Sequence, residues 1–245
     1  MSIAFFDVDG TLLPHPSLER RFFWNLVRNR KIPAGNYFRW AAEMFRLGVP
    51  RFRTAAQANK MYLRGISATL LSAMGSGETN HWVPELFPAA IQRVWEHALR
   101  GDTIVLVTGT LAPLAKIVQS ALERELLWRG VETQIPVIAT QLAERHGCWT
   151  GCIVGAAMFG DAKANAVRQF ASSNGVPLSQ CFAYGDHALD RSMLEVAGIR
   201  FAVNPTFRLR RMARRNGWPI VSWSPHPPRP AATRRALKWK DEGAR

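Results

Sequence analysis

Two aspartates stand two positions apart directly after a short apolar run near the start of the chain. Asp7 and Asp9 follow residues 3–6, whose sequence Ile-Ala-Phe-Phe is typical of a buried strand. Side chains two residues apart in a strand point to the same side, so the two carboxylates would repel each other there. A divalent cation or a bound cationic group would compensate this charge. In the simpler alternative, both carboxylates cap backbone amides in a turn.

Further groups that could hold an ion follow at the ends of later apolar runs. Thr108 and Gly109 stand where a strand is expected to become a helix, a place that presents a hydroxyl and backbone amides to an anion. Lys163 lies near the start of an amphipathic helix, where a lysine is unfavourable for the helix dipole. Asp186 and Asp190 are four residues apart, so both can face one ligand from a strand end and the first turn of a helix. Each group taken alone also fits a helix cap or a solvated side chain.

The segments that carry these groups alternate between strand and helix patterns. Strands are expected at residues 103–107, 136–139, 181–184 and 199–203, and helices at residues 111–128, 162–172, 189–196 and 209–216. This alternation predicts an α/β fold with a mostly parallel, Rossmann-like sheet and helices on both faces. Ligands of such sheets bind at the carboxyl ends of the strands, where the polar groups are expected to lie.

Residues 15–95 interrupt this alternation. They show consecutive helical patterns in which Lys and Arg are interleaved with aromatic residues, and turn signals separate them. We predict an all-α insertion there, between the first two strands of a core made of residues 1–14 and 96–223. Residues 224–245 combine prolines with basic residues, which predicts a basic, poorly ordered tail.

Length and composition are those of a globular chain with one large domain and an insertion. The chain has 245 residues, of which 47% are hydrophobic and 20% charged, enough apolar residues for a buried core. No apolar run approaches the roughly 18 residues of a spanning helix, and the first residues lack the basic region of a signal peptide. Three cysteines are too few for a disulfide framework. We therefore expect a cytoplasmic protein.

The net charge of +14 is concentrated in two segments. Residues 15–100 carry 13 Lys and Arg against five Asp and Glu, and residues 200–245 carry 12 against two. Such a basic surface attracts phosphorylated ligands, anionic lipid or nucleic acid through the same long-range field. The arginines of residues 208–215 have no recognised nucleic-acid module beside them, so we expect no nucleic-acid partner.

A helix expected at residues 37–47 leaves two interpretations of the basic insertion open. The residues that share its apolar face are Tyr37, Trp40, Ala41, Met44 and Phe45. This face could pack into the insertion's own core, as most amphipathic helices do. It could instead lie on an anionic membrane, helped by the basic tail, which would make the protein peripherally membrane-associated.

In their order along the chain, these groups resemble the haloacid-dehalogenase-like phosphohydrolase superfamily. The resemblance rests on the motif DVDGT at residues 7–11, on Thr108, on Lys163 and on the motif GDxxxD at residues 185–190, and it covers residues 1 to about 223. The insertion resembles the helical C1 cap of subfamily IB, the phosphoserine-phosphatase-like subgroup. The resemblance implies an Mg²⁺-dependent phosphomonoesterase that acts through an aspartyl-phosphate intermediate on a small phosphorylated metabolite or phospholipid precursor.

The resemblance also implies the catalytic roles. Asp7 would be the nucleophile, and Asp9 would protonate the leaving oxygen and later activate water. Thr108 and Gly109 would bind the phosphoryl oxygens, and Lys163 would neutralise charge on the nucleophile and the phosphate. The physical reason is that a carboxylate can attack an anionic phosphate ester only when cations screen it.

The same resemblance implies the metal site. Mg²⁺ would be held by Asp7, by Asp186 and by the backbone carbonyl of Asp9, and Asp190 would orient the groups around the metal. Asp9 also favours phosphoryl chemistry within the superfamily, because dehalogenases need no proton donor at this position. Transfer of the phosphoryl group to an alcohol acceptor uses the same residues and stays an alternative. A catalytically weak protein that binds anionic surfaces is a second alternative, which the intact motifs disfavour.

Several residues depart from the phosphoserine phosphatase pattern. Pro16 lies nine residues after the predicted nucleophile, where those enzymes carry a glutamate that binds the substrate amine. Proline cannot bind an amine, so the pattern argues against phosphoserine as the substrate. His15 and Arg20 are the nearby candidates for contacting a different head group. His187 and Leu189 replace a glycine and an asparagine in the last motif, beside the predicted metal site.

Overall fold

A single sheet of seven strands organises the chain, and the computed structural model describes residues 2–47, 59–70 and 85–224. The strands are β1 (Ile3–Phe6), β2 (Thr103–Leu111), β3 (Val137–Arg145), β4 (Cys148–Val154), β5 (Cys181–Gly185), β6 (Ile199–Val203) and β7 (Ile220–Val221). Their order is β4-β3-β2-β1-β5-β6-β7, and only β4 runs antiparallel to its neighbour. The predicted α/β fold with a mostly parallel sheet is confirmed.

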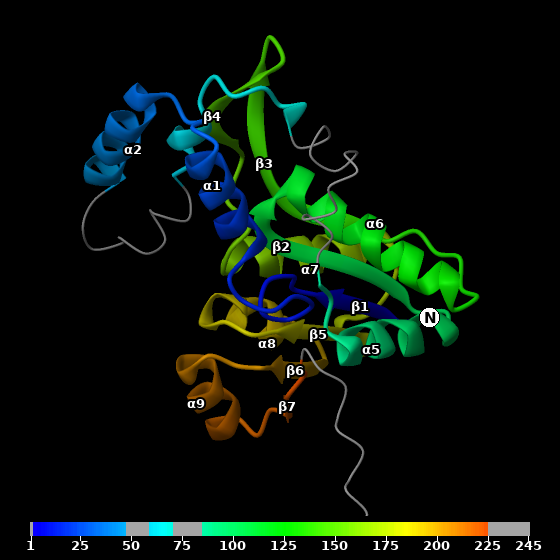
Figure 1. Cartoon of the computed structure of the whole chain (residues 1–245). Coiled ribbons are helices and arrows are strands. Elements are labelled where there is room, and N and C mark those ends of the chain that lie inside the picture. Colours follow the sequence, from blue (N-terminus) through cyan, green and yellow to red (C-terminus); the bar gives the residue numbers. More distant parts are fainter. Residues whose placement is uncertain (1, 48–58, 71–84, 225–245) are drawn as a thin grey trace, which may run out of the picture.

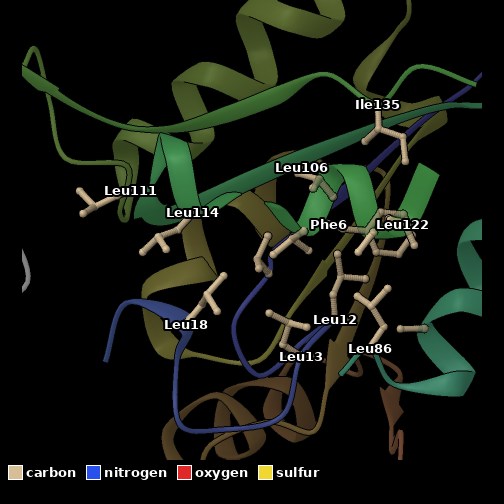
Figure 2. Packing of buried hydrophobic residues seen from close by; sticks show 14 of the residues in the cluster. Phe6, Leu12, Leu13, Leu18, Leu86, Leu106, Leu111, Leu114, Leu122 and Ile135 are labelled. Atoms are coloured by element: carbon tan, nitrogen blue, oxygen red, sulfur yellow. The ribbon is translucent and has the colours of Figure 1, made fainter. Parts of the chain in front are cut away.

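Helices lie on both faces of this sheet. The helices are α1 (Leu18–Arg28), α2 (Ala34–Leu47), α5 (Pro88–Leu99), α6 (Ala112–Trp128), α7 (Asp161–Ser173), α8 (Arg191–Val196) and α9 (Phe207–Arg215), with short 3₁₀ turns η2 (Met61–Leu63), η3 (Leu178–Gln180) and η4 (Ala188–Asp190). Ala4 and Phe6 of β1 pack in a cluster with α1, α5 and α6, which Figure 2 shows from close by. Ile3 and Phe5 pack in a second cluster with α7, α8 and α9. Successive side chains of a strand point to opposite faces, so β1 joins both halves of the core.

Stacked aromatic rings hold β1, β5 and β6 together behind their carboxyl ends. Phe6 stacks on Tyr184 with 4.3 Å between ring centroids, and Tyr184 stacks on Phe201 with 5.0 Å. The Tyr184 hydroxyl lies 2.8 Å from Nε2 of the buried His97, whose Nδ1 lies 2.8 Å from Asp102. These contacts fix the strands from which the acidic residues of the motifs emerge.

A hairpin extends the sheet toward the insertion. β3 and β4 pair in antiparallel fashion around a turn at His146 and Gly147, both with positive φ. On its other side, β4 pairs with residues 65–68, and the Gly65 amide donates to the carbonyl of Trp149 at 2.8 Å. Figure 1 shows this hairpin beside α1 and the cyan segment of residues 59–70. The hairpin therefore ties the insertion to the core.

The helix α1 begins the described part of the insertion. Ser17 caps it by accepting a hydrogen bond from the Arg20 amide. Leu18, Phe22 and Leu26 recur every four residues and are buried in the core cluster. This packing orients the other side of the helix toward the carboxyl ends of the strands.

The boundaries of the predicted cap stay a prediction. Residues 48–58 and 71–84, within the predicted cap, lie outside the described residues, as does the tail from residue 225 onward. The predicted limit at residue 95 falls inside α5, which packs against the sheet. The apolar residues of α5 pack against the sheet. In the sequence, their helical pattern looks the same as the helical patterns of the predicted insertion, so the boundary was placed inside this helix.

Candidate active site

The register of the sheet brings the motif residues to one edge. Phe6 of β1 is level with Leu106 of β2 and Tyr184 of β5. The Asp7 amide continues this pattern by donating to the Tyr184 carbonyl at 2.9 Å. Parallel strands present their carboxyl ends together, so the residues that follow these three positions share one site.

A buried lysine connects two of the acidic residues. Lys163 Nζ donates to Asp7 Oδ1 at 2.5 Å and to Asp190 Oδ1 at 2.6 Å. Burial opposes the charge of Lys163, but Asp190 and Asp7 outweigh this effect and raise the pKa of its ammonium group. The lysine therefore stays a cation at the floor of the site.

Three carboxylates surround a place that fits a divalent cation. Oxygen atoms of Asp7, Asp186 and Asp190 lie within 4.8 Å of one another. Burial raises the pKa of Asp7 well above its ordinary value, the carboxylates of Asp190 and Asp186 raise it further, and Lys163 opposes them. One lysine does not balance three carboxylates, so this donor set suits Mg²⁺, which prefers oxygen ligands.

The three carboxylates differ in how many of their oxygen atoms are already hydrogen-bonded. Both oxygens of Asp190 are engaged, one by Lys163 and one by the His187 amide at 3.0 Å, which leaves Asp7 and Asp186 as the better direct ligands. Gly10 leaves room beside Asp186, because a Cβ atom at this position would lie 2.3 Å from Asp186 Oδ2. Its φ of +88° is also one that glycine adopts readily.

The Asp9 carboxylate is not part of this three-carboxylate group. Its Oδ1 accepts a hydrogen bond from the Leu18 amide at 2.7 Å, and its Oδ2 accepts one from the Thr110 hydroxyl. The strand geometry assumed for Asp7 and Asp9 does not apply, because β1 ends at Phe6 and the chain turns at Gly10, but both residues line the same cavity. Asp9 thus sits between the core and the first turn of α1, whose amides favour a carboxylate.

Thr108 and Gly109, near the carboxyl end of β2, line the same site. The buried Thr108 hydroxyl accepts from the Thr110 amide at 3.1 Å, which leaves its own proton for a ligand oxygen. A side chain on Gly109 would overlap the ring of Phe159, since a Cβ atom there would stand 1.9 Å from it. Thr110 is not a helix cap, because α6 begins two residues later and the Thr110 hydroxyl holds Asp9.

A cavity of about 990 Å³ opens over these groups. Its core wall contains Asp7, Asp9, Thr108, Gly109, Thr110, Phe159, Lys163, Asp186, His187, Leu189 and Asp190, and its other wall contains His15, Pro16, Ser17, Glu19, Arg20, Phe23, Trp40, Asn59, Lys60 and Tyr62. The structure brings every predicted site residue to this one cavity. His15 lies 3.2 Å from Asp186 through its Nε2 atom, and Arg20 is exposed.

Several cavity residues carry no signal in the sequence, and four of them contact another side chain of the cavity. Thr110 contacts Asp9, and Glu19, Lys60 and Tyr62 contact one another on the insertion wall. None of them belongs to a short motif, because their partners are tens of residues away in the chain. Lys60 precedes the apolar residues of η2, but its burial, which calls for a negative charge opposite, is known only from the structure.

A parallel sheet with a lysine and several carboxylates at its carboxyl edge defines an α/β enzyme that acts on an anionic ligand. Comparison with known proteins agrees, since residues 4–195 match the haloacid dehalogenase-like hydrolase family. The chain belongs to this family and is a phosphatase within it.

The relatives cover different parts of the chain. A probable phosphatase of Mycobacterium tuberculosis is 30% identical over 236 residues, which are 90% of this chain and 75% of that protein. A phosphoserine phosphatase of the same bacterium is 28% identical over 238 residues, 89% of this chain and 69% of that protein. An "Inhibition of morphological differentiation protein" of Streptomyces azureus is 37% identical over 141 residues, but these span only 57% of this chain and 47% of that protein.

A solved structure shares the fold over nearly its whole length. The crystal structure of a protein with unknown function from Bordetella pertussis Tohama I is similar with a TM-score of 0.71 and 27% identity. The similarity covers 90% of this chain and 97% of that one.

Among the described residues of the present chain, no helix combines the length and apolar character needed to cross a membrane.

Proposed function

We propose that the chain is an Mg²⁺-dependent phosphomonoesterase that works through an aspartyl-phosphate on Asp7. The observation that carries this proposal is the position of Lys163, buried between Asp7 and Asp190 beside Asp186. The small phosphorylated metabolite or phospholipid precursor would enter through the cavity above them. Mg²⁺, held by Asp7, Asp186 and the Asp9 carbonyl, would supply charge neutralisation at the phosphoryl group.

The protein's own groups would carry the two chemical steps. An Asp7 oxygen attacks phosphorus while the bond from phosphorus to the leaving oxygen breaks, and Asp9 gives its proton to that oxygen. A water molecule then attacks phosphorus while the bond from phosphorus to the Asp7 oxygen breaks, and Asp9 takes up the proton of this water, so that inorganic phosphate leaves and the Asp7 carboxylate is restored. Thr108 and the Gly109 amide bind the phosphoryl oxygens, and Lys163 stabilises the charge that develops on them. We propose water as the acceptor, rather than an alcohol, because the family is one of hydrolases.

The substitution Asp9→Asn tests the proton transfer. An asparagine can still accept the hydrogen bond from the Leu18 amide, so the fold is expected to persist. We expect kcat to fall by about 10²- to 10⁴-fold on an alkyl phosphate, which needs a proton on its leaving oxygen. The matched control is Asp161→Asn, an exposed acid in the first turn of α7. Wild-type kcat in the Asp9 variant would exclude it as the acid.

Removal of divalent cations tests the metal site. We expect EDTA to lower phosphatase activity by at least about 100-fold and Mg²⁺ to restore it. The variant Asp186→Ala should need a Mg²⁺ concentration at least about tenfold higher for half-maximal activity, because one carboxylate ligand is lost. Titration of activity against free Mg²⁺ measures both effects. Full activity in the chelator would contradict the proposal.

Peripheral membrane contact is proposed as well, on the observation that α2 carries exposed aromatic residues. Among the five residues of its predicted apolar face, only Met44 is buried, which favours the membrane interpretation over packing of this face into the insertion. Phe38 and Phe45, seven residues apart on one side of α2, are 79% and 81% exposed. Exposed basic residues, among them Arg28 and Arg39, add charge suited to anionic lipid.

Binding to vesicles tests this contact. The protein is expected to co-sediment with phosphatidylglycerol vesicles more than with phosphatidylcholine vesicles, and less so as salt is raised. Replacing Phe38 and Phe45 by serine should lower the bound fraction at least about threefold, because two apolar anchors are lost. Deletion of the basic tail should lower it too. Equal binding to both kinds of vesicle would remove the proposal.

A further inference from the structure

An ion pair lies on the insertion wall of the cavity, the wall formed by residues of the predicted insertion. Glu19 in the first turn of α1 contacts the ammonium group of Lys60, and the Tyr62 hydroxyl donates to Glu19 Oε1 at 3.1 Å. Lys60 and Tyr62 are buried, and Glu19 is largely so. The carboxylate and the ammonium group therefore neutralise each other before any ligand arrives.

The neighbouring polar groups of this wall are also engaged. Asn59 donates to the Trp40 carbonyl at 2.8 Å and accepts from the Met61 amide at 3.1 Å. Within the described part of the insertion wall, Arg20 is the one charged side chain for which the structure shows no ion pair. It is exposed, and an ion pair at an exposed arginine contributes little.

What this wall offers instead is apolar surface. Phe23 and Trp40 line it together with Pro16, and Leu189 and Phe159 lie on the core side. A cavity of about 990 Å³ is at the upper end of the sizes that hold drug-sized ligands, and it is far larger than a phosphorylated amino acid needs.

We propose that the leaving group of the substrate is bulky and uncharged, and that its apolar part binds against Phe23 and Trp40. This inference rests on the proposed phosphomonoesterase function and names the class of its substrate. An ammonium group in this place would have to break the pair of Glu19 and Lys60 or stay buried without a partner. A carboxylate would have to break the same pair or rely on the exposed Arg20, whose ion pairs contribute little. An aromatic or aliphatic alcohol has no charge that needs a partner. Its binding also removes the apolar surface of Phe23 and Trp40 from water, which is favourable.

Three phosphate esters of primary alcohols test the selectivity of the wild-type enzyme. Benzyl phosphate is the uncharged bulky probe, and O-phosphoserine and 3-phosphoglycerate are the charged ones. We expect kcat/KM with Mg²⁺ to be at least about 30-fold higher for benzyl phosphate than for either charged ester. In Trp40→Ala, this preference should shrink by at least about fivefold, since the apolar wall is cut back. A wild-type preference for O-phosphoserine would overturn the inference.

The substitution Glu19→Gln tests the role of the ion pair. It leaves the ammonium group of Lys60 without its partner, so the ratio of kcat/KM for 3-phosphoglycerate to that for benzyl phosphate should rise at least about tenfold. The double variant Glu19→Gln, Lys60→Met should lose this gain, because the cation is gone. Glu195→Gln, which breaks the exposed pair with Arg191 on α8, is the matched control with the wild-type ratio. An unchanged ratio in Glu19→Gln would contradict the role of the pair.

Binding of phosphonates separates this inference from the proposed function. Benzylphosphonate and 2-amino-3-phosphonopropanoate cannot be hydrolysed, and calorimetry measures their affinities directly. We expect benzylphosphonate to bind at least about tenfold more tightly. If benzylphosphonate binds more tightly but the protein hydrolyses none of the esters, the proposed ligand class stands and the phosphomonoesterase function fails. If the amino acid analogue binds more tightly, the substrate class fails, whatever the enzyme hydrolyses.

Discussion

Turnover is expected to fall by at least about 10⁴-fold in Asp7→Asn, with the fold retained. Asparagine has nearly the same shape as aspartate, but its amide cannot form the acyl-phosphate bond. Lys163 keeps its contact of 2.6 Å with Asp190 in this variant, so its charge stays paired. The loss should therefore be chemical rather than structural.

Three measurements check this expectation. Steady-state kinetics give kcat, and circular dichroism with a thermal melt shows whether the protein is folded. Acid-quenched mass spectrometry during turnover should find one added phosphoryl group on the wild-type protein and none on the variant. Activity within tenfold of wild type, or a phosphoryl group that persists in the variant, would exclude Asp7 as the nucleophile.

The second large effect is expected from Lys163→Met, which should lose stability as well as activity. Asp7 and Asp190 would remain buried without the cation that joins them. Breaking a buried ion pair in this way costs about 3–5 kcal/mol. For a chain of this length, that corresponds to a melting temperature lower by about 6–20 °C. We also expect kcat to fall by at least about 100-fold, because the phosphoryl oxygens lose a fixed positive charge.

The matched control is Lys116→Met, which removes an exposed lysine of α6 and should melt near the wild-type temperature. Differential scanning calorimetry with and without Mg²⁺ gives the measurement. Added Mg²⁺ should recover part of the lost stability of the Lys163 variant, since it compensates the same carboxylates. A variant as stable as wild type without Mg²⁺ would show that the buried lysine does not hold the cluster together.

Most core elements could be predicted because their signals are local. The strands β1, β2 and β5 contain continuous apolar runs, β6 contains a run that only Arg200 interrupts, and α6, α7 and α9 show helical periodicity close to their observed limits. The short strand β7 carried no such signal, because two residues count as a strand only through their pairing with β6. The extension of β3 to Arg145 was missed for a similar reason, since its exposed polar residues are ordered by β4.

The floor of the active site could also be predicted from the chain alone. Asp7, Thr108, Lys163 and Asp186 follow strands or open helices, and parallel strands necessarily present their carboxyl ends at one edge. Their motif order supplied the superfamily resemblance, and the family match confirmed it. What the pattern missed were the partners of the Asp9 carboxylate, the Leu18 amide and the Thr110 hydroxyl, because β1 ends at Phe6 and strand geometry does not extend to Asp9.

The sequence by itself determined the sheet, its polar edge and the class of chemistry, because apolar runs, helical periods and short motifs act over a few residues. Only the tertiary structure decided what surrounds the leaving group. Glu19 and Lys60 are 41 residues apart, and Thr110 reaches Asp9 across 101 residues. Such contacts depend on how the insertion packs against the β3–β4 hairpin and the sheet, and no local pattern encodes that packing.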